Sequence, residues 1–290
     1  MTTSSDDPWK KSVDDRWAAK GLNDYITLVK IFEQAKAAAK DGNTLAQLVV
    51  GNMYSQGQGV IQDYAEAVRW YKLAAEQGCE DAQSALGNLY RDGQGVVKDV
   101  AEALRWFKLA AEQGSTSAQF ELGDMYRSGK DVPNDNTQAA QWYKLAAEQG
   151  NTSALVILGA MFEYGQGIEE NLTEALKWYK LAAAKNNLDA QYQLAQIYRY
   201  RRNFSQDFAE AARWYKLAAE QGHADSQFNI GMMYWDGKGV LQDYLLAHMW
   251  LHVSAANGNK NALEKCELIV HEMTIDQIEA ALKMAEKYQV

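Results

Sequence analysis

The sequence predicts an all-α protein, a solenoid built from helix-turn-helix repeats. Tryptophan recurs every 36 residues without insertion or deletion, at Trp70, Trp106, Trp142, Trp178, Trp214 and Trp250. The nonapeptide WYKLAAEQG appears at positions 70–78, 142–150 and 214–222, and WFKLAAEQG appears at 106–114. Only two prolines occur in 290 residues, which suits a nearly all-helical chain with short connections. A fixed period of this length is the signature of a solenoid whose units stack on one another.

The first half of each period predicts one helix and a turn. In the first unit this helix covers about Thr44–Gln56, with apolar residues such as Ala46 and Tyr54 at helical spacing. Gly51 stands where a close helix–helix approach requires a small residue. The turn GQGV follows at positions 57–60, because glycine permits the positive φ that ends a helix.

The second half of the period predicts a second helix, at about Tyr64–Gln77 in the first unit. One broad apolar face is predicted there, and Gly78 ends the helix. Asp63 and Glu66 have the spacing of a capping box at its start. We expect these side chains on the apolar face to pack against neighbouring helices: Ala67, Trp70, Tyr71, Leu73, Ala74.

The chain is predicted to divide into a leader, six repeats and a closing segment. The leader, 1–42, contains a capping helix at about Leu22–Lys40, and the closing segment, 259–290, contains a terminal helix at Met273–Tyr288. Thr274 and Gln277 form a capping box for that last helix. The six repeats are predicted at 43–78, 79–114, 115–150, 151–186, 187–222 and 223–258.

Composition excludes several classes of partner and compartment. A net charge of −9 and a pI of about 5.1 disfavour binding to nucleic acid or to an anionic membrane. No run reaches the roughly 20 apolar residues that membrane insertion needs. The start, MTTSSDDPWKKSVDD, has no apolar core of a signal peptide, and two distant cysteines do not make a disulfide framework. We therefore expect a cytoplasmic protein.

Catalytic and metal-binding motifs are absent from the sequence. There is no GxSxG, HExxH, CxxC or SxxK, so we expect no enzyme activity, no catalytic residues and no cofactor. His248 and His252 are four residues apart and could share a metal, but no third ligand is evident nearby. By register, His248 falls on a packing position and His252 on an outward one, so no metal site is expected.

The repeated unit resembles the Sel-one-like repeat (SLR), a relative of the tetratricopeptide repeat. The resemblance covers positions 43–258 and is carried by the pattern A…LG..Y..G.GV..D...A..W...AA..G. It implies a right-handed superhelix whose first helices line a concave groove, a scaffold or adaptor function in binding other proteins, and a bacterial source. Cysteine-rich relatives for which β-lactam chemistry has been proposed carry paired cysteines in each repeat, and this chain does not.

Two units depart from the repeat pattern in their turns. The third has GKDVPNDN at 129–136, without the second turn glycine, and the fifth has RYRRNF at 199–204, without either. We expect the turn of the fifth unit to differ in shape, and either departure is drift or a projection that contacts a partner. RYRRNF could contact a partner, but three arginines in an acidic chain do not make a nucleic-acid track.

Tetratricopeptide geometry implies a series of groove positions that repeats every 36 residues, with Leu45, Leu48, Asn52, Ser55 and Gln56 in the first unit. These positions vary among the units, whereas the packing positions do not. Aromatic and methionine side chains, which are enriched in binding hot spots, gather in units four to six. Tyr192 and Phe228 either anchor a partner or fill the gap between hairpins, and Trp235 is expected to be exposed because Tyr234 takes the packing position. The candidate partner-binding residues are Phe120, Tyr164, Tyr192, Arg199, Tyr200, Phe228, Met232 and Trp235.

Two functions are consistent with this sequence. The favoured one is a non-enzymatic scaffold or adaptor that binds a protein or peptide in its groove, as a monomer or weak homodimer. The alternative is a structural or regulatory module that acts through self-association or a terminal surface, where Trp9 and Trp17 would matter more than the groove.

Overall fold

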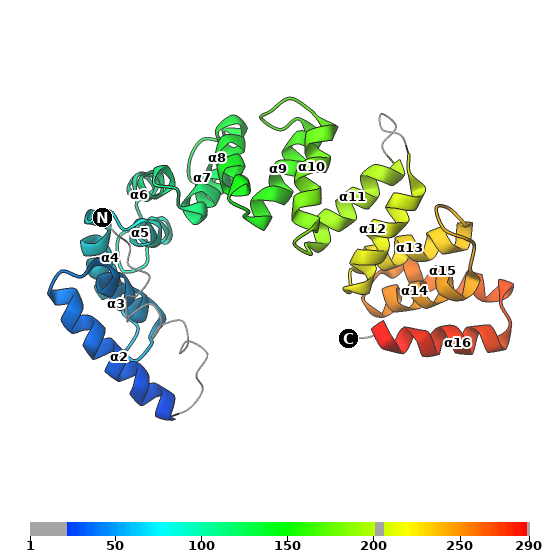
Figure 1. Cartoon of the computed structure of the whole chain (residues 1–290), viewed down its shortest axis with the longest axis horizontal. Coiled ribbons are helices and arrows are strands. Elements are labelled where there is room, and N and C mark those ends of the chain that lie inside the picture. The colour runs from blue at the N-terminus through cyan, green and yellow to red at the C-terminus, as the bar shows by residue number, and fades with distance from the viewer. Residues whose placement is uncertain (1–21, 201–205, 289–290) are drawn as a thin grey trace. The chain divides into compact units, whose positions relative to one another are not determined.

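The computed structural model describes residues 22–200 and 206–288, and every regular element within these ranges is a helix (Figure 1). Helix pairs follow one another along the chain, as the sequence predicts. The elements are α2 Leu22–Lys40, α3 Thr44–Gln56, α4 Tyr64–Glu76, α5 Glu80–Asp92, α6 Val100–Glu112, α7 Thr116–Ser128, α8 Asn136–Glu148, α9 Thr152–Tyr164, α10 Leu172–Ala183, α11 Leu188–Tyr200, α12 Phe208–Glu220, α13 Ala224–Asp236, α14 Tyr244–Ala256, α15 Lys260–Ile269, η1 Val270–Glu272, α16 Ile275–Ala285 and η2 Glu286–Tyr288.

The chain divides into two units, which are described separately. The N-terminal unit is Met1–Asn151 and the C-terminal unit is Thr152–Val290. In the N-terminal unit, α2 packs on α3, and Ile31 and Phe32 join the same buried cluster as the first two repeats. The leader helix therefore extends the apolar core of the first two repeats.

In five of the six repeats, a bulky side chain of the second helix lies against a glycine of the first helix. Gly123 on α7 faces Tyr143 on α8, and a Cβ on Gly123 would lie 2.7 Å from two atoms of that ring. Gly159 faces Tyr179 in the same way in the fourth repeat. The alanines of the AA pair are buried because the next first helix packs on them. Small residues at these positions let the helices approach closely, as the sequence predicts.

In the first, second, fourth and sixth repeats, both glycines of the turn between the two helices take a positive φ. Gly93 has φ +69° and ends α5, while Gly95 has φ +70° and lies against the backbone of Tyr64 in the preceding repeat. A Cβ on Gly95 would come 2.3 Å from the carbonyl carbon of Tyr64. In the third repeat Asp131 replaces this second glycine and does not take a positive φ, so the backbone of that turn differs at this position.

An aspartate or asparagine side chain caps the N-terminus of each second helix. Asp63 Oδ1 accepts hydrogen bonds from the backbone N–H groups of Ala65 and Glu66. The Glu66 side chain pairs with Arg69 at 2.5 Å. At α16 the full capping box predicted from Thr274 and Gln277 is present.

One predicted packing residue is wrong. The sequence pattern places Leu73 on the buried face of the second helix, but 45% of it is exposed. Successive helical residues are about 100° apart around the axis, so Leu73 lies outside the buried face that contains Ala67, Tyr71 and Ala74. The same position is exposed in the next four repeats, at Leu109, Leu145, Leu181 and Leu217.

The closing segment covers the last repeat. α15 and α16 both pack on α14, and the Trp250 ring lies 4.8 Å from the Tyr288 ring, centroid to centroid. Met249 is buried here, although the corresponding residue of the first repeat is the exposed Arg69. Among the helices that the structure describes, none is long and apolar enough to cross a membrane.

Candidate partner-binding site

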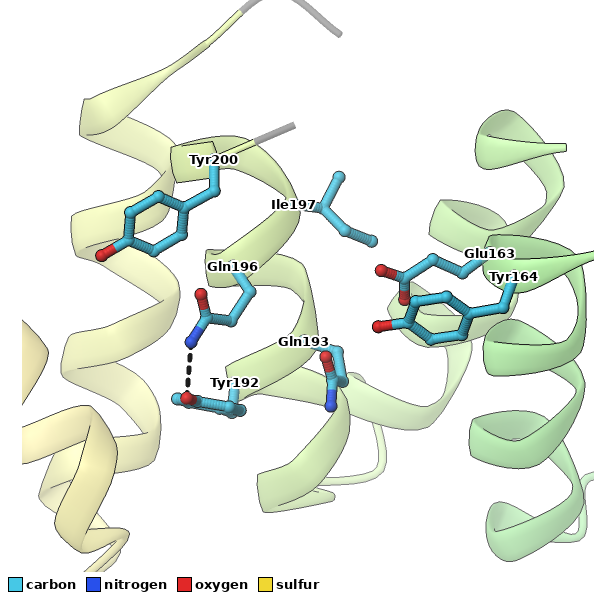
Figure 2. A pocket seen from close by; sticks show the side chains of 7 residues that line it. All are labelled: Glu163, Tyr164, Tyr192, Gln193, Gln196, Ile197 and Tyr200. Atoms are coloured by element: carbon cyan, nitrogen blue, oxygen red, sulfur yellow. Dashed lines mark hydrogen bonds between the residues drawn. The ribbon is translucent and has the colours of Figure 1, made fainter. Parts of the chain in front are cut away.

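A cavity of about 440 Å³ lies between α9 and α11 in the C-terminal unit. These are the first helices of the fourth and fifth repeats. Figure 2 shows Glu163 and Tyr164 extending from α9 towards α11, whose side chains form the opposite wall. The lining residues are Glu163, Tyr164, Tyr192, Gln193, Gln196, Ile197 and Tyr200.

The α9 wall combines a buried carboxylate with an exposed ring. Glu163 is only 5% exposed, and its Oε2 accepts a hydrogen bond from the Tyr179 hydroxyl at 3.0 Å. Tyr179 is itself buried on α10, so this contact fixes the carboxylate at the cavity wall. Tyr164, the last residue of α9, is 58% exposed. One wall therefore offers a fixed negative group beside an accessible aromatic face.

The α11 wall is built from residues one helical turn apart. Gln196 Nε2 donates to the Tyr192 hydroxyl, and this contact is drawn in Figure 2. Tyr192 is half-buried, with its ring 6.0 Å from the Tyr215 ring and 4.9 Å from the His223 ring, centroid to centroid. Burial raises the pKa of Tyr192, so its hydroxyl stays protonated at neutral pH. Tyr200, at the end of α11, is 53% exposed.

Arg199 lies beside the cavity on α11. Its guanidinium carbon is 4.8 Å from the centroid of the Tyr200 ring and 5.9 Å from that of Tyr215. Nη1 donates to Oδ1 of Asn229 on α13 at 2.8 Å. Burial raises the pKa of Tyr215, and the positive charge of Arg199 opposes this shift. Arg199 thus holds the Tyr200 ring in place and links α11 to α13.

The other predicted site residues lie elsewhere. Phe120 is in the N-terminal unit, half-buried, with its ring 5.7 Å from Tyr143 in an edge-on contact. Phe228, Met232 and Trp235 are in the C-terminal unit, and all three pack against a cluster that α14 and α15 complete. The cavity thus brings together Tyr164, Tyr192 and Tyr200, with Arg199 adjacent, and leaves the remaining four outside it.

Trp235 differs from its predicted environment. The sequence predicts an exposed ring, whereas the residue is half-buried. The reason is the closing helix α15, whose Cys266 and Ile269 extend the apolar cluster that Trp235 contacts. Burial also raises the pKa of the Cys266 thiol to about 11, consistent with a packing role for this side chain.

Three polar cavity residues are missing from the predicted site residues: Glu163, Gln193 and Gln196. Glu163 and Gln196 fall on groove positions of the repeat, where the corresponding second-repeat residues are Arg91 and Asn88. The polar side chains at these two groove positions could therefore have identified Glu163 and Gln196 from the sequence. Gln193 lies outside the groove series, so register gave no signal for it.

The two histidines of α14 behave as their register predicts. His248 is buried, and its pKa is lowered first by burial and then by His252, whose ring stacks at 6.2 Å between centroids. Within the described residues, no cluster of three or more His, Cys, Asp or Glu side chains could hold a metal ion. The other predicted contact regions, Trp9, Trp17 and the 201–204 part of RYRRNF, lie outside the described residues.

The comparisons with known proteins agree with the repeat frame. The Sel1 repeat family model matches six consecutive segments, 44–79, 80–115, 116–151, 152–187, 188–223 and 224–259, one residue later than the predicted frame. A Sel1 repeat protein of Oxalobacter formigenes is 32% identical, with 78% of this chain and 98% of that chain covered and a TM-score of 0.61. None of the curated proteins matches significantly.

Two further solved structures are similar over long stretches. A protective antigen of uropathogenic Escherichia coli with an SLR fold is 24% identical, with 97% of this chain and 94% of that chain covered and a TM-score of 0.42. A Sel1 repeat protein of Klebsiella pneumoniae subsp. pneumoniae is 25% identical, with 70% and 98% covered and a TM-score of 0.41.

Proposed function

Because this chain belongs to the Sel1 repeat family, we propose that it is a non-enzymatic scaffold whose C-terminal unit holds a protein or peptide partner between α9 and α11. Sel1 repeat proteins are generally protein-interaction scaffolds. Membership of the family supports the class of function, and the cavity supports the location of the binding site.

The observation that carries the proposal is the pair of exposed tyrosines at the cavity. Tyr164 is 58% exposed and Tyr200 is 53% exposed, and both line a cavity of about 440 Å³. Tyrosine gives large contact area at low cost in side-chain entropy, and it is enriched in binding hot spots. Rigid helices hold both rings, which favours a preformed site.

The repeat itself supplies an internal comparison. The position of Tyr164 and Tyr200 is occupied by Gln56, Asp92 and Ser128 in the first three repeats, and all of these are exposed. Packing of the repeat therefore does not require an aromatic residue there. Under this proposal, the tyrosines of the fourth and fifth units serve contact with the partner.

The test is site-specific photo-cross-linking in a lysate of the source cell. A photoreactive phenylalanine analogue replaces Tyr164 in one variant and Tyr25 in the control, because Tyr25 is 54% exposed on α2, outside the cavity. We expect a discrete cross-linked protein from position 164, suppressed by an excess of unmodified chain, and none from position 25. Equal products from both positions, or none from position 164, would contradict the proposal. Cross-linking to a second copy of this chain would instead support the self-association alternative.

A further inference from the structure

We propose that copies of this chain associate head to tail, with α2 of one copy lying on α15 of the next. In this arrangement α15 and the α2 of the second copy act as the first and second helices of one composite repeat. The interface does not include the cavity between α9 and α11, so this inference does not depend on the proposed function.

A second cavity, of about 580 Å³, lies between α14 and α15, with Gly258 and Leu263 in its lining. The second repeat shows what fills the corresponding place within the chain. There Gln113, at the end of α6, donates to Oε1 of Gln83 at 2.6 Å, and its own Oε1 would lie 3.9 Å from a Cβ on Gly78. Gly258 and Leu263 correspond to Gly78 and Gln83 in the register of the repeat. The cavity is therefore the place that the end of a second helix occupies in an earlier repeat, and α16 contributes no residue to its lining.

Side-chain exposure also shows that this place is open. Leu263 is 60% exposed, whereas Leu155, at the same position of the fourth repeat, is 1% exposed where α10 packs on α9. Ala255, in the lining, is half-buried, although the corresponding alanine of each earlier repeat is at most 4% exposed. Covering these apolar groups with a helix would favour association through the hydrophobic effect.

α2 is a helix of the type that this place accepts. The backbone of Leu28 lies against Gly59 as the backbone of Tyr64 lies against Gly95, so α2 precedes the first repeat as the second helix α4 precedes the second repeat. Ala38 is half-buried, whereas the corresponding alanine of each of the first five repeats is 0% exposed. α2 therefore keeps a packing position that is not fully covered in the single chain.

Two opposite charges would meet in the composite repeat. In the first repeat, the Thr44 hydroxyl donates to Gln77 Oε1 at 2.7 Å, which joins the start of the first helix to the end of the second. In the composite repeat, Lys260 takes the position of Thr44, and Asp41 of the second copy takes the position of Gln77. Within the described residues neither Lys260 nor Asp41 forms an ion pair. An ion pair between copies would thus replace the hydrogen bond.

Each of these charges lies at the unfavourable end of its own helix. Lys260 is the first residue of α15, and Asp41 directly follows the last residue of α2. The helix dipole favours anions at the start of a helix and cations at its end, so an opposite charge from a second copy would offset both penalties. The fourth repeat has a similar combination, because Leu155 stands in the position of Leu263 and the charged Lys185 in that of Asp41.

The experiment measures the association of the intact protein by sedimentation velocity over a range of concentrations. Because the interface joins different surfaces of the two copies, association should continue beyond the dimer as the concentration rises. Lys260→Glu and Asp41→Lys each place like charges opposite one another, and a chain that carries both changes restores the pair. Lys130→Glu is the control, since Lys130 is exposed in the turn between α7 and α8. All four changes are at exposed residues or combine such changes, and circular dichroism checks that the variants fold.

We expect a dissociation constant about five-fold higher for each single reversal, and wild-type association for the double variant and the control. Leu263→Glu should also weaken association, because it places a second carboxylate beside Asp41. A mass that stays at one chain at every concentration would overturn the inference. Association that the single reversals leave unchanged, or that the double variant does not restore, would overturn it as well. The proposed function stands or falls on its own cross-linking test.

Discussion

At the scale of single residues, the third repeat depends on a close contact between a glycine and a tyrosine ring. Gly123 lies against the Tyr143 ring, and the Tyr143 hydroxyl is held in turn by Asp124 and Arg127. The ring cannot move aside without breaking those hydrogen bonds. The sequence indicated this contact, because a small residue recurs there every 36 positions while its neighbours change.

The first prediction concerns the Gly123→Ala variant. Helix propensity alone would stabilise it by about 1 kcal/mol. The new Cβ would lie 2.7 Å from Cδ1 and Cε1 of Tyr143, and overpacking of this kind costs about 1–3 kcal/mol. We expect a net loss of stability, measured as a lower urea midpoint. Gly231→Ala is the matched control, since its Cβ would lie 3.0 Å from Leu251 Cγ and 3.2 Å from the Ala247 carbonyl oxygen, which are wider contacts than those at Gly123 and should cost less. A midpoint at or above wild type for Gly123→Ala would refute this account.

Asp135 is a second residue whose effect can be measured. It caps α8, and hydrogen bonds from the backbone and then the side chain of Gln138 lower the pKa of its carboxyl. A lowered folded-state pKa means that the unfolded chain binds more protons. The stabilisation is therefore present above the unfolded pKa of about 3.9 and is lost as the pH falls through the folded value.

The prediction is that Asp135→Asn makes the thermal stability of the protein less sensitive to acid. Asn171 caps α10 in the same way, accepting from the Glu174 N–H at 3.1 Å, so the variant should keep its thermal midpoint at pH 7. Between pH 5 and about pH 3 its midpoint should fall less than that of the wild type. Thermal scans over this range test it, and parallel curves for the two proteins would show that the cap carries no such linkage.

At the scale of elements, a buried glutamine joins the first, second, third and sixth repeats to the helix that precedes each of them. Gln83 on α5 donates to the Ala75 carbonyl of α4 at 3.1 Å and accepts from Gln113 Nε2 at 2.6 Å. The last glutamine of WYKLAAEQG therefore has a structural role in the N-terminal unit. In the fourth repeat, Leu155 and Lys185 occupy these two positions, so both members of the pair are replaced together.

This pairing predicts a coupling between Gln83 and Gln113. Gln83→Leu removes both hydrogen bonds and should destabilise the protein by about 1–2 kcal/mol. The double variant Gln83→Leu/Gln113→Lys copies the fourth repeat and should cost less than the sum of the single changes. A double-mutant cycle from urea denaturation measures the coupling. Additive costs would mean that the two glutamines act independently.

At the scale of the molecule, the 36-residue period predicted the positions of the helices far better than the burial of individual side chains. The helices, the two-glycine turns and the caps depend on local sequence patterns, and most repeats carry the same patterns. Leu73 and Trp235 were misplaced because their burial depends on neighbouring helices, namely the sector that the next repeat covers and the position of α15. The cavity was only partly predicted: register indicated Tyr164, Tyr192 and Tyr200, but not that Glu163 completes their wall.

The central claim is that partners bind between α9 and α11, and one titration tests it most directly. A peptide selected on the intact protein is titrated by calorimetry against the wild type, Tyr164→Ala/Tyr200→Ala and the control Tyr25→Ala. Both exposed cavity rings are removed in the first variant, and an equally exposed ring outside the cavity is removed in the control. The account predicts at least about ten-fold weaker binding for the double variant and wild-type binding for the control. Equal affinity for all three proteins would contradict it.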